Sequence, residues 1–299
     1  MDATKYIWMN DKLVNWNEAN VHVLTHSLHY GSAVFEGIRC YNTSKGKAIF
    51  RLNDHIKRLV RSANFLKMNV PYSQEALLNA VVKTVQANEV SECYIRPIIY
   101  YGYGVMGLNP SKAPVDVSIA VWPWNNYLGD NPSKVMASSY IRIHPDSTNV
   151  KAKVSGHYVN SIIASLEAKD HGFDEALLLD YMDHVAEGPG ENIFIVKDNV
   201  IYTPEVGSIL PGITRKTIVR LAKDLGYDVV KTELELIDVI DADEVLFCGT
   251  AAEVHPIIQV DDTVINNGKI GEVTIKLKKM YSDVVHGKLD NYNYWLTYI

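Results

Sequence analysis

Apolar residues along the chain fall into two kinds of segment. Short apolar or alternating runs predict strands at 6–9, 39–41, 47–51, 93–102, 116–122, 134–143, 176–180, 200–204, 227–234 and 244–260. Apolar residues at three- and four-residue spacing predict helices over 53–68, from Ser73 onward, over 159–171, after the Leu-Pro-Gly turn at 210–212, and over 272–286. Strands and helices alternate unevenly, which favours an α+β fold over a regular doubly wound sheet.

The first long helix predicts an exposed arginine. Asn53 is a suitable N-cap, and the buried stripe is expected to contain Ile56, Leu59, Val60 and Ala63. Arg58 lies on the opposite side of this helical wheel. We therefore expect a solvated charge there unless an anionic ligand or a second domain covers that face.

Turn-forming residues predict the domain organisation. The segment Trp124 to Ser133 reads WNNYLGDNPS and contains a proline near its end. A chain of 299 residues is long enough for two cores. We predict a smaller N-terminal domain at 1–123, a linker at 124–132 and a larger C-terminal domain at 133–299.

Composition excludes several classes of partner. Hydrophobic residues make up 47% and charged residues 21%, the net charge is −6, and no Lys/Arg cluster stands out. Nucleic acid and anionic membrane surfaces are therefore disfavoured. The N-terminus lacks the layout of a signal peptide, and no apolar run reaches the length of a membrane span. The three cysteines are far apart, so a disulfide framework is not indicated. We expect a cytoplasmic protein.

The stretch KAKVSGHYVNSII, 151–163, is a candidate site for covalent chemistry. We expect a strand end, a small-residue turn and a helix with one apolar face. A lysine packed there beside Tyr158 would be desolvated, which favours its neutral, nucleophilic form. Strand alternation places Lys151 and Lys153 on the same face, so periodicity does not choose between them.

Two other motifs are interpreted as structural. His22, His26 and His29 could share one helical face, but no accompanying carboxylate completes a metal-ligand pattern, so we expect packed or hydrogen-bonded histidines and no metal. Residues 102–107 match Gly-x-Gly-x-x-Gly, yet the prolines that follow cannot open the helix that a dinucleotide site requires.

Several remaining segments suit a cofactor that carries an aldehyde and a phosphate. The turn before Ile213 presents amides at a helix N-terminus, a favourable place for phosphate. Thr250 offers a hydroxyl, and Arg58 would gain an anionic partner. Glu187, in a Gly/Pro turn, could keep a pyridine nitrogen protonated. Tyr94 and Arg96 alternate onto one strand face, and Arg96 requires an anionic partner there.

Together these motifs resemble one known family. The runs VHVLTHSLHYGSAVFEGIR, CYIRP, Lys-x-x-Gly-x-Tyr at 153–158, AEGPGENIF, LPGITR and CGTAAE have the order and spacing of branched-chain amino acid aminotransferases, which are fold-type IV enzymes that use pyridoxal 5'-phosphate (PLP). The resemblance covers almost the whole chain. It implies an α+β fold of two domains with the cofactor between them, and at least a homodimer.

The resemblance also implies a role for each matching residue, and it selects Lys153 over Lys151 as the PLP lysine. The expected cofactor residues are Arg58, Lys153, Tyr158, Glu187, Ile213, Thr214 and Thr250. The expected substrate residues are Tyr30, Phe35, Gly37, Arg39, Tyr94, Arg96, Tyr127, Thr250 and Ala251, with Tyr30 and Tyr127 expected from a partner subunit. The sequence departs from the family pattern at Pro189, where alanine is frequent, and at His255, where threonine is frequent.

The implied reaction is transamination between leucine, isoleucine or valine and 2-oxoglutarate, which gives branched-chain 2-oxo acids and L-glutamate. D-Amino-acid aminotransferase and aminodeoxychorismate lyase are alternatives of the same fold. The EGIR run and the Tyr-x-Arg motif favour the branched-chain enzyme. A PLP-binding protein without turnover is a further alternative, but the chain retains both the lysine and the pyridine carboxylate.

Overall fold

The chain forms two compact units. The computed structural model describes residues 2–124, 128–129 and 131–299. Unit 1 contains Met1–Trp124, Ala152–His157 and Val284–Ile299, and unit 2 contains Asn125–Lys151 and Tyr158–Asp283. Unit 1 therefore includes Lys153, which is distant from residues 1–124 in the sequence. The division of the sequence at 123/124 and 132/133 stays a prediction.

Unit 1 is built on an antiparallel sheet. Among the described residues it has 8 strands in the order β17-β5-β4-β6-β7-β1-β2, with β3 paired to β6. The strands are β1 (Tyr6–Met9), β2 (Lys12–Asn15), β3 (Ala33–Phe35), β4 (Ile38–Thr43), β5 (Gly46–Phe50), β6 (Cys93–Tyr101), β7 (Val115–Pro123) and β17 (Leu296–Tyr298). The central strand β6 carries the alternating residues that the sequence analysis assigned to substrate.

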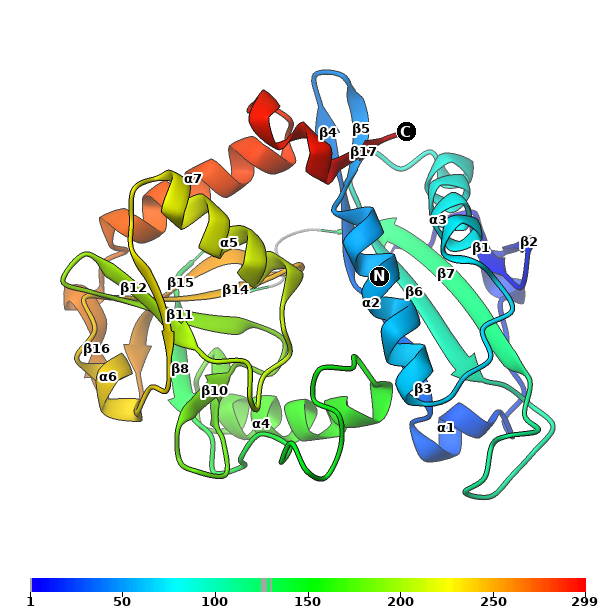
Figure 1. The fold of residues 1–299 in the computed structure, drawn as a ribbon, viewed down its shortest axis with the longest axis horizontal. Coiled ribbons are helices and arrows are strands. Elements are labelled where there is room, and N and C mark those ends of the chain that lie inside the picture. The colour runs from blue at the N-terminus through cyan, green and yellow to red at the C-terminus, as the bar shows by residue number, and fades with distance from the viewer. Residues whose placement is uncertain (1, 125–127, 130) are drawn as a thin grey trace. The chain divides into compact units, whose positions relative to one another are not determined.

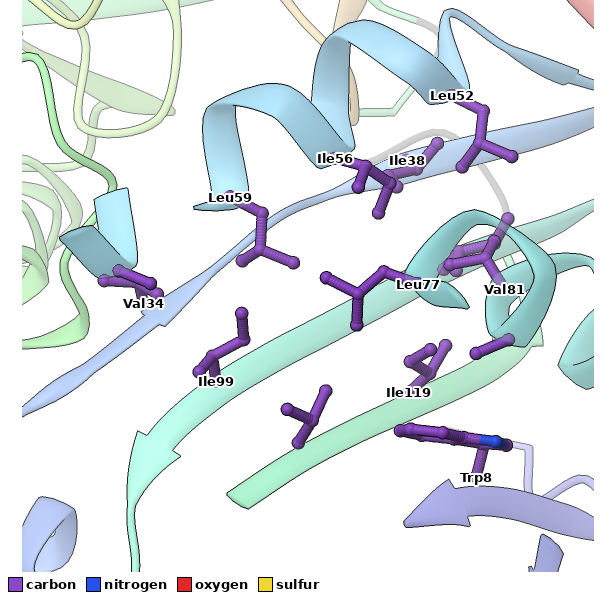
Figure 2. Close-up of a cluster of buried hydrophobic side chains, with 14 of the residues drawn as sticks. Trp8, Val34, Ile38, Leu52, Ile56, Leu59, Leu77, Val81, Ile99 and Ile119 are labelled. Carbon is purple, nitrogen blue, oxygen red and sulfur yellow. The ribbon is translucent and has the colours of Figure 1, made fainter. Parts of the chain in front are cut away.

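Two helices pack on this sheet and complete its core. Figure 1 shows α2 (Leu52–Phe65) and α3 (Gln74–Asn88) in front of β6 and β7. In Figure 2, Leu52, Ile56 and Leu59 from α2 and Leu77 from α3 lie among buried side chains of the sheet. Burial of such side chains supplies the main favourable free energy of folding.

The starts of these two helices differ from each other in how well the sequence predicts them. The Ser73 side chain accepts a hydrogen bond from the backbone N–H of Ala76, so the predicted cap of α3 is confirmed. The predicted cap of α2 is wrong. That helix begins at Leu52 after Arg51, whose φ is 52°, and Asn53 lies inside it. Arg51 takes the N-cap position without a side-chain capping bond, and its Nε pairs with Asp54 at 2.7 Å.

Unit 2 has a mixed sheet. The described residues form 9 strands, ordered β10-β9-β8-β15-β14-β11-β12-β13, with β16 paired to β15 and an additional pairing between β10 and β11. The β10–β11 pairing closes part of the sheet on itself. The strands are β8 (Ser133–Ala137), β9 (Glu175–Leu179), β10 (Val185–Glu187), β11 (Asn192–Lys197), β12 (Val200–Pro204), β13 (Val229–Thr232), β14 (Glu244–Gly249), β15 (Glu253–Val260) and β16 (Thr263–Val264). The strand predicted over 134–143 thus ends at Ala137.

The helix α4 presents its apolar face to the surface of the single chain. The helices of this part are α4 (Tyr158–Asp170), α5 (Ile213–Asp224), α6 (Leu236–Ile240) and α7 (Glu272–Val285). In α4 the small residues Ser161, Ala164 and Ala168 are buried, whereas Val159 is 61% and Leu166 57% exposed. Hydrophobic periodicity located this helix correctly, but its larger apolar residues are not the ones that pack on unit 2.

Short helices complete the fold. They are η1 (Trp16–Glu18), α1 (His26–Tyr30), η2 (Ser155–His157), η3 (Ile265–Gly268) and η4 (Asp290–Trp295). Mixed sheets and helices in two units confirm the α+β class. Within the described residues, no helix combines the length and the apolar character needed to cross a membrane.

Candidate active site

Unit 1 fixes the backbone of Lys153 on both sides. The Lys153 N–H donates to the Ser62 hydroxyl at 3.0 Å, and the Lys153 carbonyl accepts from the Phe35 N–H at 3.1 Å. The following residue, Val154, forms an isolated bridge with Val34. The predicted strand end is therefore a turn with a single bridge. Because α2 and β3 hold the main chain, only the side chain of Lys153 remains to be oriented.

The structure distinguishes the two lysines that the sequence pattern left equivalent. Lys151 is exposed, whereas Lys153 is half-buried, with its Nζ 5.0 Å from the centroid of the Phe35 ring. A lysine packed against a ring, with its backbone held on both sides, has a defined position from which its amine can act as a nucleophile. Lys153 is thus the lysine suited to covalent chemistry.

Arg58 is buried, contrary to the predicted solvated side chain. It is 7% exposed and donates from Nε and Nη2 to the two carboxylate oxygens of Glu36, at 2.5 and 2.8 Å. Glu36 also accepts from Nδ1 of His55 at 2.7 Å. The helical wheel predicted an exposed Arg58 because it considers α2 alone, whereas the Glu36 carboxylate, between β3 and β4, pairs with Arg58. These three residues form a buried ionic cluster on α2.

The charges in this cluster are set by its members. Burial alone would raise the pKa of Glu36, but the Arg58 guanidinium and His55 together hold that pKa well below its usual range. Burial lowers the pKa of His55, and the charges of Arg58 and Lys153 lower it further, although Glu36 opposes them. At neutral pH the cluster therefore contains an ionised carboxylate, a guanidinium and a neutral imidazole.

Aromatic rings surround Arg96 on β6. The guanidinium carbon of Arg96 lies 4.7 Å from the Phe35 ring centroid, 5.2 Å from that of Tyr94 and 5.9 Å from that of Trp122. Arg96 also donates to the Tyr94 hydroxyl at 3.4 Å. Among the described residues, the buried Nε of Arg96 and Nε1 of Trp122 have no hydrogen-bond partner. Two buried donors without acceptors create a place for an anionic group.

Gly37 and Arg39 border the same strand face. A Cβ on Gly37 would lie 1.8 Å from the Tyr94 hydroxyl, so only glycine leaves room for that ring. Arg39 is buried, stands opposite Tyr94 in the β4–β6 register and lies over the Tyr41 ring at 4.8 Å. The structure therefore places the predicted substrate residues Phe35, Gly37, Arg39, Tyr94 and Arg96 together.

Tyr30 lies in a different part of unit 1. It is 42% exposed, its ring packs on His26 at 4.5 Å, and its hydroxyl accepts from the Gly107 N–H at 3.3 Å. Tyr127, the other residue expected from a partner subunit, lies outside the described residues.

Unit 2 holds Glu187 among four donated hydrogen bonds. Arg142 Nε donates at 2.8 Å, Asn192 Nδ2 at 2.9 Å, and the Leu210 N–H at 3.1 Å to each carboxylate oxygen. Such donors stabilise an ionised carboxylate. Arg142 also donates to Asn160, two residues after Tyr158 at the start of α4. The start of α4 is thereby linked to Glu187 through Arg142.

Asn192 connects Glu187 to the Leu-Pro-Gly turn. Its Nδ2 also donates to the Leu210 carbonyl at 3.0 Å, and a Cβ on Gly212 would lie 2.0 Å from its Oδ1. Helix α5 begins directly after this turn, at Ile213 and Thr214, both buried, and the N-cap Gly212 makes no side-chain capping bond. The first-turn amides and the helix dipole favour an anion at this end.

The turn at Thr250 and Ala251 belongs to the same part of unit 2. Both residues are half-buried and connect β14 with β15. The preceding residue, Gly249, is close enough to the Glu187 turn that an added Cβ would lie 3.3 Å from the Gly190 carbonyl oxygen. Unit 2 therefore brings together Glu187, the start of α5 and the 250–251 turn.

The three histidines and the glycine-rich match were both interpreted as structural motifs. His26 is buried and bonded to Ser32 and to the Gly107 carbonyl, His29 bonds the Val23 carbonyl, and His22 accepts from the Leu24 N–H. This confirms the predicted packed or hydrogen-bonded histidines. Residues 108–114 after the Gly-x-Gly-x-x-Gly match contain no helix.

The two departures from the family pattern occupy different positions. Pro189 lies in the β10–β11 turn, where the Gly188 N–H donates to the Glu191 carbonyl at 2.8 Å. His255 is buried on β15 and its Nε2 lies 2.8 Å from the Ser133 hydroxyl. His255 is thus part of the packing of the unit 2 sheet.

The sequence analysis missed the partners of the predicted residues. These are Glu36 and His55 beside Arg58, Trp122 beside Arg96, and Arg142 and Asn192 beside Glu187. A usable signal existed only for Glu36, a carboxylate inside the apolar run AVFEGI.

The family is established by comparison with known proteins. The model of the family described as amino-transferase class IV matches residues 33–260. The chain belongs to the class IV amino-transferases.

Within that family the chain is similar to branched-chain enzymes. It is 46% identical to the branched-chain-amino-acid aminotransferase of Pseudomonas aeruginosa, over 100% of this chain and 98% of that one. It resembles the solved structure of the T.th. branched-chain amino acid aminotransferase with pyridoxamine 5'-phosphate, with a TM-score of 0.97, 44% identity and coverage of 100% and 99% of the two chains. The same T.th. enzyme complexed with N-(5'-phosphopyridoxyl)-L-glutamate gives a TM-score of 0.95 at 44% identity, with coverage of 99% and 98%.

Proposed function

We propose that this protein is a PLP-dependent aminotransferase that moves an amino group between branched-chain L-amino acids and 2-oxoglutarate. Leucine, isoleucine and valine are the amino donors, and the products are the branched-chain 2-oxo acids and L-glutamate. The T.th. relative forms complexes with N-(5'-phosphopyridoxyl)-L-glutamate and with 4-methylvaleric acid, one charged and one branched apolar ligand. The D-amino-acid aminotransferase and aminodeoxychorismate lyase alternatives are not favoured.

The observation that carries the proposal is the environment of Lys153. Its backbone is bonded to Ser62 and Phe35, and its side chain is half-buried against an aromatic ring. A lysine that must bind an aldehyde covalently needs this fixed position and partial desolvation. In our proposal Lys153 would hold PLP, and its Nζ, once freed from PLP by the substrate amine, would take the proton from the substrate Cα.

The remaining residues fit PLP by their chemistry. When bound, PLP supplies an electron sink for the substrate Cα and carries the amino group between the two substrates. We assign Glu187 to the pyridine nitrogen, because the carboxylate is held in its ionised form by Arg142 and Asn192. We assign Arg58, Thr250 and the amides of Ile213 and Thr214 to the phosphate, and Tyr158 to the phenolic oxygen of the ring.

We assign the substrate-binding part of the site from Tyr94 and Arg96 on β6. We assign the substrate α-carboxylate to Tyr94 and to the amides of the Thr250–Ala251 turn. Phe35, Gly37 and Arg39 border the side-chain pocket. Arg96, caged by aromatic rings and with a buried donor lacking an acceptor among the described residues, suits the distal carboxylate of glutamate.

We also propose a cytoplasmic homodimer. The segments around 21–30 and 103–108 are joined by the Thr25–Tyr103 bridge and expose Val23 at 70%, Leu28 at 62% and Leu108 at 89%. Such an apolar surface is typical of a subunit contact. Tyr30 lies on this surface, which supports its assignment, with Tyr127, to the site of the partner. The cysteines are buried free thiols, as expected in a reducing compartment.

A panel of half-reactions tests the proposed function. PLP-loaded protein is mixed with leucine, isoleucine, valine, glutamate, D-alanine and aminodeoxychorismate, and conversion of bound PLP to its aminated form is followed by absorbance. We expect conversion with the first four compounds. Conversion with D-alanine alone, or release of pyruvate from aminodeoxychorismate, would contradict the assignment.

A further inference from the structure

The buried carboxylate of Glu36 pairs with Arg58 and His55 but has no role yet in the proposed reaction. It is 0% exposed and sits between Phe35 and Gly37, two residues assigned to the pocket. A buried charge is costly unless it is fully paired, and its loss would leave its partners unpaired. A buried carboxylate of this kind serves either the packing of the core or the orientation and charge of the side chains beside it.

The contacts of Glu36 fix the orientation of Arg58. The carboxylate engages Nε and Nη2 of Arg58 along one edge of the guanidinium, at 2.5 and 2.8 Å. Because the guanidinium is a planar fork, this bidentate pairing fixes the direction of its opposite edge. A single hydrogen bond would leave the guanidinium free to rotate. Glu36 therefore determines where the remaining donors of Arg58 point.

The same cluster is next to Lys153. Arg58 precedes Ser62 by one turn of α2, and the Ser62 hydroxyl accepts from the Lys153 N–H at 3.0 Å. Phe35, the chain neighbour of Glu36, donates from its N–H to the Lys153 carbonyl at 3.1 Å. His55 is held by Glu36 and feels the charge of Lys153, which contributes to the lowering of its pKa after burial. Lys153 is therefore close enough to His55, which Glu36 holds, for the charge of Lys153 to be felt there.

We propose that Glu36 is a positioning residue of the cofactor site, which orients Arg58 toward the phosphate and cancels the positive charge that Arg58 would otherwise place beside Lys153. This inference rests on the proposed function, since it assumes that Lys153 holds PLP. With Glu36 ionised, Arg58 charged and His55 neutral, the cluster has no net charge. Without Glu36 it has a net charge of one positive unit.

The test uses the visible absorption of bound PLP, which changes when the nitrogen that joins it to Lys153 gains or loses a proton. In Glu36→Gln an uncancelled positive charge opposes protonation of that nitrogen. We expect the pH midpoint of the spectral change to fall by about one unit, the scale of one charge acting from about 12 Å at an effective dielectric constant of about 20. Glu36→Asp, which retains the charge, should keep the wild-type midpoint.

Glu244→Gln is the matched control. Glu244 is another buried carboxylate, and it accepts hydrogen bonds from the Val273 and Thr274 N–H groups and the Thr274 hydroxyl in unit 2. The Glu244→Gln protein should lose thermal stability without any change in the spectral midpoint. A Glu36→Gln protein with lowered stability and a wild-type midpoint would show that Glu36 serves packing alone, and would overturn the proposal.

A second variant decides the matter if Glu36→Gln does not fold. The shorter carboxylate of Glu36→Asp cannot bond both Arg58 and His55 as the native side chain does. We expect its PLP dissociation constant to rise at least about threefold through lost orientation of Arg58, while Glu244→Asp keeps the wild-type value. An unchanged constant in Glu36→Asp would overturn the proposal. Failure of the proposed function has a different signature, a visible band that survives Lys153→Ala.

Discussion

The roles proposed above assign different kinds of chemical group to the two units. Unit 1 presents long side chains from a strand, a helix and a turn, namely Lys153, Arg58, Arg96 and Tyr94. Unit 2 presents the backbone amides of Ile213, Thr214, Thr250 and Ala251, with Glu187 as its main side chain. Side chains can be removed by substitution, whereas amides cannot. Single substitutions should therefore separate the individual roles assigned to unit 1, whereas in unit 2 they should act chiefly through Glu187.

The largest effect is expected at Lys153. Lys153→Ala removes the nitrogen that bonds the cofactor, so we expect loss of the visible absorption of bound PLP and of all transamination. Lys151→Ala, the matched control on an exposed lysine, should keep both. Borohydride reduction followed by peptide mapping gives the independent measurement, and a label on Lys151 would reverse the assignment.

Glu187 should give the next largest effect and is the side chain on which unit 2 depends. Glu187→Gln keeps the shape and the hydrogen bond from Asn192 but removes the negative charge that maintains a protonated pyridine nitrogen. We expect PLP to remain bound while the rate of Cα–H cleavage falls by about 10²–10⁴-fold, the usual range for loss of a proton-controlling group. Single-turnover rates with leucine and with its Cα-deuterated form measure this step. A nearly normal rate would mean that Glu187 is structural.

The same contrast explains what could be predicted from the sequence. The turns of unit 2 are predictable locally, because Gly212 and Gly188 to Gly190 occur beside the residues that they position. In unit 1 the helices and strand β6 were predictable from periodicity, and so was the shared face of Tyr94 and Arg96.

The long-range partners in unit 1 were not predictable. Glu36 and Arg58 are separated by 22 positions in the sequence, and Lys153 and Ser62 by 91. Which side of α2 meets the β3–β4 connection depends on the packing of the sheet, and no local propensity encodes it. The packing of α4 was not predictable for a related reason, because hydrophobic periodicity identifies a face to cover without saying what covers it.

Two arginines of unit 1 have different proposed roles: Arg58 binds the phosphate, and Arg96 binds the distal carboxylate of glutamate. An apolar pocket would reject the distal carboxylate of glutamate, so Arg96 is expected to pair with it and to remain at the pocket edge when leucine binds. Arg96→Met should reduce kcat/KM for glutamate and 2-oxoglutarate by roughly 2–4 kcal/mol in activation free energy. The half-reactions with leucine, isoleucine and valine should fall much less. Equal losses with leucine and glutamate would instead assign Arg96 to the α-carboxylate or to the fold.

The smallest expected effect concerns the stability of unit 2 and leaves its chemistry untouched. Burial, with help from the charge of Lys278, lowers the pKa of His255 to about 4, against 6.5 for the ordinary side chain. The unfolded chain therefore binds a proton between these two pH values when the folded chain does not, so stability is full above about pH 6.5 and declines as the pH falls toward 4. Each pKa unit corresponds to about 1.4 kcal/mol, which sets a ceiling of roughly 3 kcal/mol near pH 4.

His255→Thr, which offers a hydroxyl near Ser133 but cannot titrate, should flatten this part of the stability curve. Urea unfolding at intervals from pH 7 to pH 4, in wild type and variant, measures the difference. Parallel stability curves for wild type and variant would show that His255 is solvated in the folded protein. A flattened curve for the variant, with unchanged turnover at pH 7, would show that His255 contributes to the stability of unit 2 and not to the reaction.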